Sequence, residues 1–278
     1  MTRMHREYAL DFDSLARRLR PLAGQRGWRL VIEARAASTN ASVREAFKSA
    51  SDGAPCVALA ATQTDGVGRR GSHWSSGPGD GLWFSLALPA EQRPNSPAGA
   101  APPSLALAGE LADRLRRAGV PVEVKWPNDL YLADGKLGGL MLERGRLGDH
   151  VAWVAGVGIN WRLPDRDLAS GYHPACLSQA QGAAKGEAWR DDPVGLALDL
   201  VIDAVDLILA PNRWAVVVDS LRRRHYWYGV AVDVIPERGA GYRAVGGDIR
   251  PDGLLEVIRD DGRRLAVGPN DRVRAAST

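Results

Sequence analysis

The sequence has few of the residues that mark disulfide-bonded, metal-binding or membrane proteins. It contains two cysteines, Cys56 and Cys176, and no CxxC pair, so a disulfide framework is not indicated. The five histidines show no HxH or HExxH spacing, which argues against a dedicated zinc site. No segment approaches the roughly 18 apolar residues of a membrane span, and the N-terminus lacks the apolar core of a signal peptide. We therefore expect a cytoplasmic protein with reduced thiols and no membrane partner.

An excess of charge of one sign is also missing. The chain has 36 Lys and Arg against 33 Asp and Glu, and a net charge of +3 does not by itself indicate a nucleic-acid partner. Apolar residues at 45% and charged residues at 25% are ordinary for a globular protein and exclude wholesale disorder, collagen-like repeats and coiled coils. At 278 residues, the chain is long enough for one large domain or for a large and a small one.

Apolar spacing predicts mixed helices and strands up to residue 228 and short strands beyond it. The predicted helices cover residues 13–22, 41–50, 104–118, 194–209 and 213–224, and the strands cover 28–34, 56–61, 82–88, 122–126, 130–132, 137–144 and 151–161. Four further strands, separated by turns, are predicted at 230–235, 242–249, 254–258 and 263–267. We expect an α+β fold, with one domain over residues 1–228, opened by a short helical extension (1–27), and a small all-β domain over 229–278.

A glycine- and arginine-rich segment, Gly66 to Trp74, joins two predicted strands; we call it the Gly/Arg loop. Its GxGxxG spacing matches the dinucleotide fingerprint, but that motif requires a helix to follow, and here a strand pattern follows. A protein-kinase loop does join two strands, yet the chain has no HRD or DFG motif. Exposed backbone N–H groups and the guanidinium groups of Arg69 and Arg70 suit the loop to holding an anion. The alternative is a glycine-rich connection with solvent-exposed arginines.

A second informative segment runs from Lys125 to Gly139, with an Asp134-Gly135 hairpin signal inside it; we call it the KWPND hairpin. Pro127 lacks the backbone N–H that a strand uses for pairing, so we expect it to turn Asn128 and Asp129 away from the hydrogen-bond ladder of the strand. The Asp129 carboxylate is then free to bind magnesium or a proton. The paired glycines that end the segment leave room for a ligand near the backbone. A plain hairpin with one solvent lysine is the alternative. Together, the two segments predict chemistry on a nucleotide phosphate.

These segments resemble those of biotin protein ligases, which activate biotin with ATP and attach it to a lysine of a carboxylase carrier domain. The resemblance covers most of the chain and rests on Ser38-Thr39-Asn40, Gln63-Thr64 with the Gly/Arg loop, the KWPND hairpin, and Gly156-Val157-Gly158-Ile159-Asn160. It implies a mixed β-sheet catalytic domain of the biotin/lipoate ligase type with helices packed on it, followed by a small SH3-like β-barrel. It also implies a biotinyl-adenylate intermediate, ATP and Mg²⁺ as cofactors, and biotin and a biotin carboxyl carrier domain as partners.

The resemblance also implies roles for individual residues. Biotin-binding residues would be Ser38, Thr39, Asn40, Gln63, Gly66, Val67, Gly139, Gly156 and Gly158. ATP-binding residues would be Gly68, Arg69, Arg70, Gly71, Trp74, Asn128, Lys136 and Asn160. Lys136, Arg69 and Asp129 would be catalytic, and Asp129 would also bind Mg²⁺. Other readings stay open, because Ser38 to Asn40 suit a helix cap, Gly156 and Gly158 suit a strand bent beneath neighbouring backbone, and Trp74 suits a core.

Two positions depart from the family pattern, which usually has alanine and arginine where this chain has Asp65 and Val67. A biotin-binding homologue with weakened catalysis therefore stays open as an alternative. The nearest enzyme alternative is a lipoate or octanoate ligase of the same fold, which lacks the Gly/Arg loop and the KWPND run. A biotin-responsive repressor is the alternative from another class. One short helix before Ser38 is too little for a helix-turn-helix unit, so we expect no DNA binding.

Overall fold

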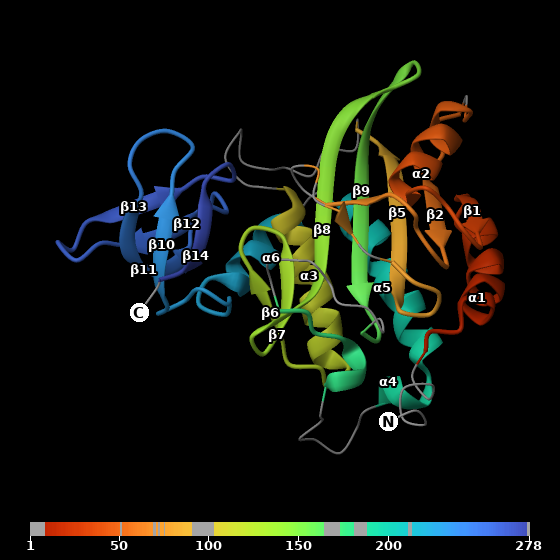
Figure 1. Cartoon of the computed structure of the whole chain (residues 1–278). Coiled ribbons are helices and arrows are strands. Elements are labelled where there is room, and N and C mark those ends of the chain that lie inside the picture. The colour runs from red at the N-terminus through yellow and green to blue at the C-terminus, as the bar shows by residue number, and fades with distance from the viewer. Residues whose placement is uncertain are drawn as a thin grey trace.

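The computed structural model describes residues 9–50, 52–68, 71, 73–74, 76–90, 103–163, 173–180, 188–210 and 213–276. Its elements in chain order are α1 (Phe12–Gln25), β1 (Arg29–Glu33), α2 (Thr39–Lys48), β2 (Cys56–Ala60), β3 (Gly66–Val67), β4 (His73–Trp74), β5 (Gly81–Pro89), α3 (Pro103–Arg117), β6 (Val122–Lys125), β7 (Asp129–Leu132), β8 (Gly135–Leu147), β9 (His150–Asn160), η2 (Leu177–Gln179), α4 (Ala188–Asp191), α5 (Pro193–Leu209), α6 (Arg213–Leu221), β10 (Ala231–Ile235), β11 (Tyr242–Ile249), β12 (Leu255–Ile258), β13 (Arg264–Val267) and β14 (Arg272–Ala275). Figure 1 shows a large sheet with helices around it and a smaller β-module at the C-terminus.

The large sheet is mixed, as expected. Its seven strands follow the order β1-β2-β5-β9-β8-β7-β6. Only the β1–β2 pair is parallel, and each of the other neighbours is antiparallel. Helices α3 and α5 pack against each other and contact the sheet at β6, β8 and β5, whereas α2 packs on β2, β5 and β9. The long β8–β9 hairpin runs through the middle of this sheet and extends beyond its neighbours (Figure 1).

Strand β2 explains why both faces of the sheet are covered. All five of its residues are buried, so the strand is a continuous apolar run. Val57 and Leu59 belong to the larger core, which includes residues of α1, α3 and α5, while Cys56 and Ala58 belong to a smaller core with Phe47 of α2. Because successive side chains point to opposite faces of a strand, the helices occupy both sides of the sheet.

Several predicted element ends were wrong. Helix α1 was expected to stop near Pro21, but it continues to Gln25 with Pro21 inside it. A proline inside a helix costs about 3 kcal/mol, and here the burial of Leu15, Leu19 and Ala23 along one helix face offsets that cost. Helix α2 begins at Thr39 and not at residue 41, and α6 ends at Leu221 and not at residue 224.

Five short elements were not predicted, namely η2, α4, β14 and the two strands within the Gly/Arg loop, β3 and β4. Strand β14 was missed because three of its four residues are exposed, so it lacks the apolar alternation of a half-buried strand. The C-terminal module therefore has five strands and not four, in the antiparallel order β13-β12-β11-β10-β14. The composition of residues 89–103, rich in Pro, Ala and Gly, predicts a surface connection, and residues 91–102 of it lie outside the described residues. The division between domains at residue 228 stays a prediction.

The connector between α6 and β10 (222–230) joins the module to the edge strand β6. The backbone N–H of Tyr226 donates to the Val124 carbonyl oxygen at 3.0 Å. The indole N–H of Trp126 donates to the Gly253 carbonyl oxygen at the same distance, 3.0 Å. The module therefore contacts the strand that leads into the KWPND hairpin. Within the described residues, no helix is long and apolar enough to span a membrane.

His225 in this connector is 3% exposed, and its Nε2 lies 2.9 Å from the Gly247 carbonyl oxygen. Burial lowers the pKa of His225, while the Gly247 carbonyl and Asp248 act in the opposite direction. Because an unfolded histidine titrates near pH 6.5, the unfolded state binds more protons below that pH. The His225 contribution to stability is therefore complete above about pH 6.5 and is lost as the pH falls toward the lowered pKa.

We expect His225→Gln to remove the contribution of His225 to the pH dependence of the free energy of unfolding. Urea unfolding at pH 7.5, 6.5 and 5.5 should show the free-energy difference between wild type and variant narrowing as the pH falls. A difference that stays constant across this range would show that His225 does not titrate on unfolding.

Candidate functional site

A cavity of about 340 Å³ lies where the start of α2, the β3–β4 hairpin and strands β7, β8 and β9 meet. It is lined by Ser38, Thr39, Asn40, Gln63, Val67, Gly68, Trp74, Asn128, Asp129, Lys136, Gly139, Leu140, Met141, Gly156, Val157 and Gly158. Four motifs that are far apart in the sequence thus contribute to one cavity. Its size is within the usual range for small-molecule sites.

The N-terminus of α2 forms a polar part of the cavity wall. Gln63 Oε1 accepts hydrogen bonds from the Thr39 backbone N–H at 2.8 Å and from the Thr39 hydroxyl at 3.1 Å. Ser38 occupies the N-cap position, but its side chain makes no capping hydrogen bond. Ser38 thus occupies the cap position, but Gln63 accepts the hydrogen bond from the first turn in place of the Ser38 side chain. Ser38 also lines the cavity.

Asn40 places a hydrogen-bond acceptor at the cavity. Its Oδ1 is buried and has no hydrogen-bond partner in the described part of the chain. A Cβ atom added to Gly156 would lie 2.7 Å from Asn40 Nδ2, so any larger residue there would force this amide to shift. Buried polar atoms are normally hydrogen-bonded. The unpaired oxygen therefore favours a ligand that carries an N–H or O–H donor.

The indole ring of Trp74 covers two glycines that pair across β8 and β9, Gly139 and Gly158. A Cβ atom on Gly158 would lie 2.8 Å from Trp74 Cε2, and one on Gly139 would lie 3.2 Å from Trp74 Cζ3. A larger residue at Gly139 or Gly158 would therefore meet the Trp74 ring first, and not neighbouring backbone. Trp74 also meets Trp83 edge to face, with ring centroids 6.1 Å apart. The ring forms one wall of the cavity.

The KWPND hairpin supplies the charged groups. Lys136 Nζ lies 2.9 Å from Asp129 Oδ1 and 5.4 Å from the centre of the Trp74 ring, and both charged side chains are less than one quarter exposed. Asn128 Nδ2 donates to the Leu140 carbonyl oxygen at 2.7 Å, and the Leu140 N–H donates back to the Asn128 carbonyl oxygen at 2.9 Å. This reciprocal pair fixes the hairpin, so a partly buried cation is held at a defined place in the cavity.

Some predicted site residues lie elsewhere. Asn160 is not in the cavity lining, and its Nδ2 donates to the carbonyl oxygens of Ala175 at 2.9 Å and Lys136 at 3.3 Å, which supports the Lys136 backbone. Gly66 pairs with Trp74 in the β3–β4 hairpin, and its own Cβ would lie 2.6 Å from the Trp74 carbonyl oxygen. Arg69 and Arg70 lie outside the described residues. The predicted ligand roles of all four stay predictions.

A second, outer cavity of about 590 Å³ adjoins the first and shares Ser38, Asn40, Val67, Gly68 and Met141 with it. Gly71 lines this outer cavity, as do Arg44 and Glu143, which form an ion pair of 2.6 Å. Val67 lies between the two cavities and is 50% exposed. The valine that departs from the family pattern therefore faces both spaces.

Apolar lining residues were missed by sequence reasoning, namely Leu140, Met141 and Val157. Their only signal was their position beside Gly139, Gly156 and Gly158.

For metals, the described residues contain no cluster of three or more His, Cys, Asp or Glu side chains that could hold an ion. Asp129 is the one carboxylate in the described lining of the inner cavity, and it is already paired with Lys136.

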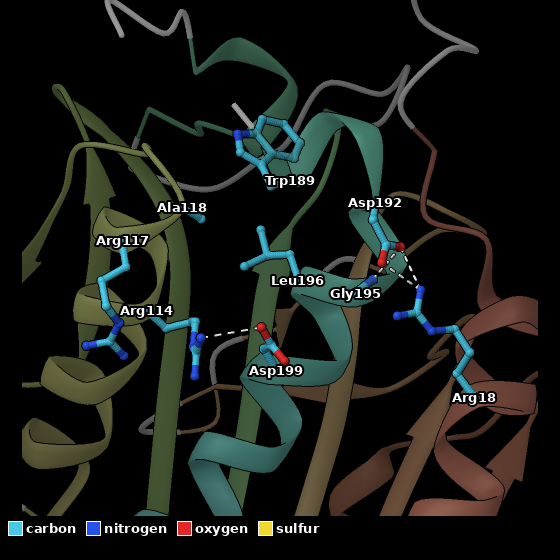
Figure 2. Close-up of a pocket in the computed structure, with 9 residues that line it drawn as sticks. All are labelled: Arg18, Arg114, Arg117, Ala118, Trp189, Asp192, Gly195, Leu196 and Asp199. Carbon is cyan, nitrogen blue, oxygen red and sulfur yellow. Dashed lines mark hydrogen bonds and ion pairs between the residues drawn. The ribbon is translucent and has the colours of Figure 1, made fainter. Parts of the chain in front are cut away.

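A third cavity, of about 380 Å³, lies among helices α1, α3, α4 and α5 (Figure 2). Its charged side chains pair with neighbouring residues. Arg18 contacts Asp192 at 2.6 Å, and Arg114 contacts Asp203 at 2.6 Å and Asp199 at 3.4 Å. These ion pairs tie α1 and α3 to α5. None of the four motifs reaches this cavity, so we assign it a structural role.

Comparisons with known proteins agree with the fold and the motifs. A model of the biotin/lipoate A/B protein ligase family matches residues 32–160. A biotin--[acetyl-CoA-carboxylase] ligase of Paracoccus denitrificans is 32% identical over 248 residues, which cover 86% of this chain and 94% of that protein. The bifunctional ligase/repressor BirA of Salmonella typhimurium is 42% identical over 128 residues, covering 45% of this chain and 38% of BirA. The chain thus matches well under half the length of the BirA proteins.

Solved structures share the architecture. The biotin protein ligase from Aquifex aeolicus in complex with biotin and ATP superposes with a TM-score of 0.67 at 17% identity, covering 89% of this chain and 99% of that one. A biotin acetyl coenzyme A carboxylase synthetase from Helicobacter pylori gives a TM-score of 0.54 at 23% identity, covering 86% and 99%. The expected catalytic domain of mixed sheet and helices, followed by a small C-terminal β-domain, is confirmed.

Proposed function

Because the chain belongs to the biotin protein ligase family, we propose that it activates biotin with ATP and transfers it to a lysine of a carboxylase carrier domain. The observation that carries this proposal is the inner cavity. It combines a polar wall at the start of α2 with a fixed cation, Lys136, within about 340 Å³. Biotin has two groups that complement these features: a polar ureido ring at one end and a carboxylate at the other.

The polar wall suits the ureido ring. That ring offers two N–H donors and one carbonyl acceptor, and the unpaired Asn40 Oδ1 is an acceptor. Ser38, Thr39 and Gln63 line the same space with hydroxyl and amide groups. Because a buried donor or acceptor without a partner costs about 1–3 kcal/mol, such a wall selects a ligand with matching groups. Met141, Val157 and the Trp74 ring provide apolar surface for the thiophane ring and the aliphatic chain.

In the first step, a carboxylate oxygen of biotin attacks the α-phosphorus of ATP, and pyrophosphate leaves. Two anions have to meet, and the Lys136 side chain of the KWPND hairpin, which lines the same cavity as the polar wall, offsets their repulsion. Arg69 and Arg70 of the Gly/Arg loop would add charge at the phosphates. Magnesium enters bound to the phosphates of ATP, as part of the substrate. A single carboxylate already paired with lysine does not make a resident site for this ion.

In the second step, the acceptor lysine attacks the carbonyl carbon of biotinyl-adenylate, AMP leaves, and the new amide nitrogen loses a proton. A lysine with a pKa near 10.4 is neutral only about once in 2,500 at pH 7. We propose that Asp129 accepts the proton, because its carboxylate lies in the cavity beside Lys136.

We expect Asp129→Asn to slow transfer from preformed biotinyl-adenylate by about 100-fold, the lower range of general-base effects. Single-turnover transfer to a carrier domain isolates this step from adenylate formation. Asp134→Asn is the matched control, since Asp134 is an exposed aspartate in the turn of the same hairpin, and it should transfer at the wild-type rate. An unchanged transfer rate for Asp129→Asn would reject the role of Asp129 as a base.

Incubation with ATP, Mg²⁺, labelled biotin and a carrier domain tests the proposed function. The expected results are a labelled carrier and pyrophosphate release that depends on biotin. Labelling by lipoate or octanoate in place of biotin would favour the other ligase of this fold. Biotin binding without pyrophosphate release would indicate a homologue that has lost catalysis, in keeping with Val67 and Asp65.

A further inference from the structure

Lys125 at the end of β6 is surrounded by aromatic rings. Its Nζ lies 4.2 Å from the ring centre of Tyr131, 4.8 Å from that of Trp227 and 5.3 Å from that of Tyr226. It also donates a hydrogen bond to the Tyr131 hydroxyl at 2.7 Å. We call these three rings the aromatic cage. A cation over the faces of several rings is attracted by each of them, so the ammonium group is held at one place.

The cage is built around the catalytic hairpin and not on a free surface. Tyr131 belongs to β7, two residues after Asp129, and its ring packs at a tilt of 50° against that of Tyr226, with centroids 4.8 Å apart. Tyr226 and Trp227 come from the connector that leads to the C-terminal module, and Trp227 is 1% exposed. The Lys125 side chain thus fills a space made by two parts of the chain that are far apart in sequence.

Lys125 is also the cross-strand partner of Asp129 in the β6–β7 pair. Strand β7 lies between β6 and β8 in the sheet. Asp129 therefore has Lys125 on the neighbouring strand at one side and Lys136 on the neighbouring strand at the other, with Lys136 Nζ at 2.9 Å. The charges of these residues therefore alternate across three neighbouring strands, positive on β6, negative on β7 and positive on β8.

The electrostatics agree with this order. Burial lowers the pKa of the Lys125 ammonium group, the Asp129 carboxylate raises it, and Lys136 lowers it further. Lys125 and Lys136 are thus close enough to repel each other, and Asp129 is the anion that relieves the repulsion.

This arrangement matters because Asp129 alone would oppose the first reaction step. A carboxylate beside the cavity repels the biotin carboxylate and the α-phosphate and also neutralises Lys136. We propose that Lys125 is a positioning residue that, fixed in its aromatic cage, balances the charge of Asp129, so that Asp129 opposes less of the attraction between Lys136 and the anionic groups of biotin and ATP. The proposal rests on the proposed ligase function and concerns the same site.

The test compares Lys125→Met with Lys125→Arg. Methionine packs well against aromatic rings, so it keeps the cage filled but removes the charge. Arginine keeps the charge and stacks on aromatic faces. We expect Lys125→Met to lower kcat/KM for ATP in biotin-dependent pyrophosphate exchange by about tenfold, mainly through KM, and the loss to shrink at high salt. Lys125→Arg should recover most of the wild-type value.

Lys48→Met serves as the charge control, because it removes the charge of an exposed lysine of α2 that lies outside both the cage and the cavity lining. It should retain activity within about twofold. Thermal unfolding of each variant shows whether the protein remains folded. Wild-type activity in Lys125→Met would overturn the proposal, and equal losses in the two Lys125 variants would show that shape and not charge is required. A wild-type protein that forms no adenylate would instead reject the ligase function, and this proposal with it.

Discussion

Lys136→Ala is expected to lower the rate of biotinyl-adenylate formation by about 100- to 1,000-fold, the range found when one charge-stabilising group is removed from an active site. Lys136 is the single cation among the described residues that line the inner cavity. Its side chain is 15% exposed, so water screens it little. The charge acts where the biotin carboxylate and the α-phosphate have to meet, and the repulsion between them is strongest in the transition state.

Pyrophosphate exchange in the presence of biotin measures this loss directly. Lys48→Ala is the matched control, because Lys48 is an exposed lysine of α2 that pairs only with Glu45 in the part of the chain the structure describes. The substitution of Lys136 also removes the ion-pair partner of Asp129 within the cavity, so the carboxylate repels the substrates more strongly. Adding Asp129→Asn to Lys136→Ala should therefore recover part of the lost rate. A loss below tenfold in the single variant would contradict the role given to Lys136.

Gly158→Ala is expected to weaken biotin binding by about 10- to 100-fold, which corresponds to the roughly 1–3 kcal/mol cost of overpacking a closed space. The added methyl group would lie 2.8 Å from Trp74 Cε2 and 3.0 Å from Trp74 Cζ2 and Nε1. Carbon atoms do not approach so closely, so the indole ring has to move. Since Trp83 packs against Trp74 and the sheet lies beneath it, the ring moves at the expense of the cavity.

Titration calorimetry with biotin checks this expectation, with Gly145→Ala as the matched control. Gly145 lies in the same β8–β9 hairpin, and a Cβ atom there meets no other atom within 4 Å. The control variant should bind biotin as wild type does. Combining Gly158→Ala with Trp74→Phe should restore part of the affinity, because the smaller ring makes room for the methyl group. Wild-type affinity in Gly158→Ala would show that Trp74 does not form the wall of the biotin site.

Much of the site was predictable because its chemistry restricts both residue type and spacing. A cation, a carboxylate and an amide within one hairpin, together with glycines beneath a tryptophan, are hard to replace, so Lys136, Asp129, Asn128, Gly139 and Gly158 stand out in the sequence. The structure brings them together in one cavity. The strands of the large sheet and of the C-terminal β-module were predicted from their apolar patterns, whereas the mixed arrangement of the large sheet was implied by the family resemblance.

The remainder depended on tertiary packing. Leu140, Met141 and Val157 could be replaced by other apolar residues without changing the sequence pattern, so nothing distinguished them as lining residues. Helix α1 passes Pro21 because its buried face packs against the rest of the molecule, a contact that local propensity does not contain. The hydrogen bonds from the Asn160 amide to the carbonyl oxygens of Lys136 and Ala175 were not predicted, and the nucleotide role implied by its motif stays a prediction.

The β3–β4 hairpin has a further consequence for how the molecule opens. It is a separate two-stranded sheet held by the pairs Gly66–Trp74 and Val67–His73, while β5 and β9 beneath it share nine residue pairs. A two-stranded ribbon of this kind has little stability of its own, so the free energy of local opening should be far below that of global unfolding. The β3–β4 hairpin that carries Trp74 can then open and re-form while the central sheet stays intact. A ligand that contacts Trp74 would stabilise the closed hairpin.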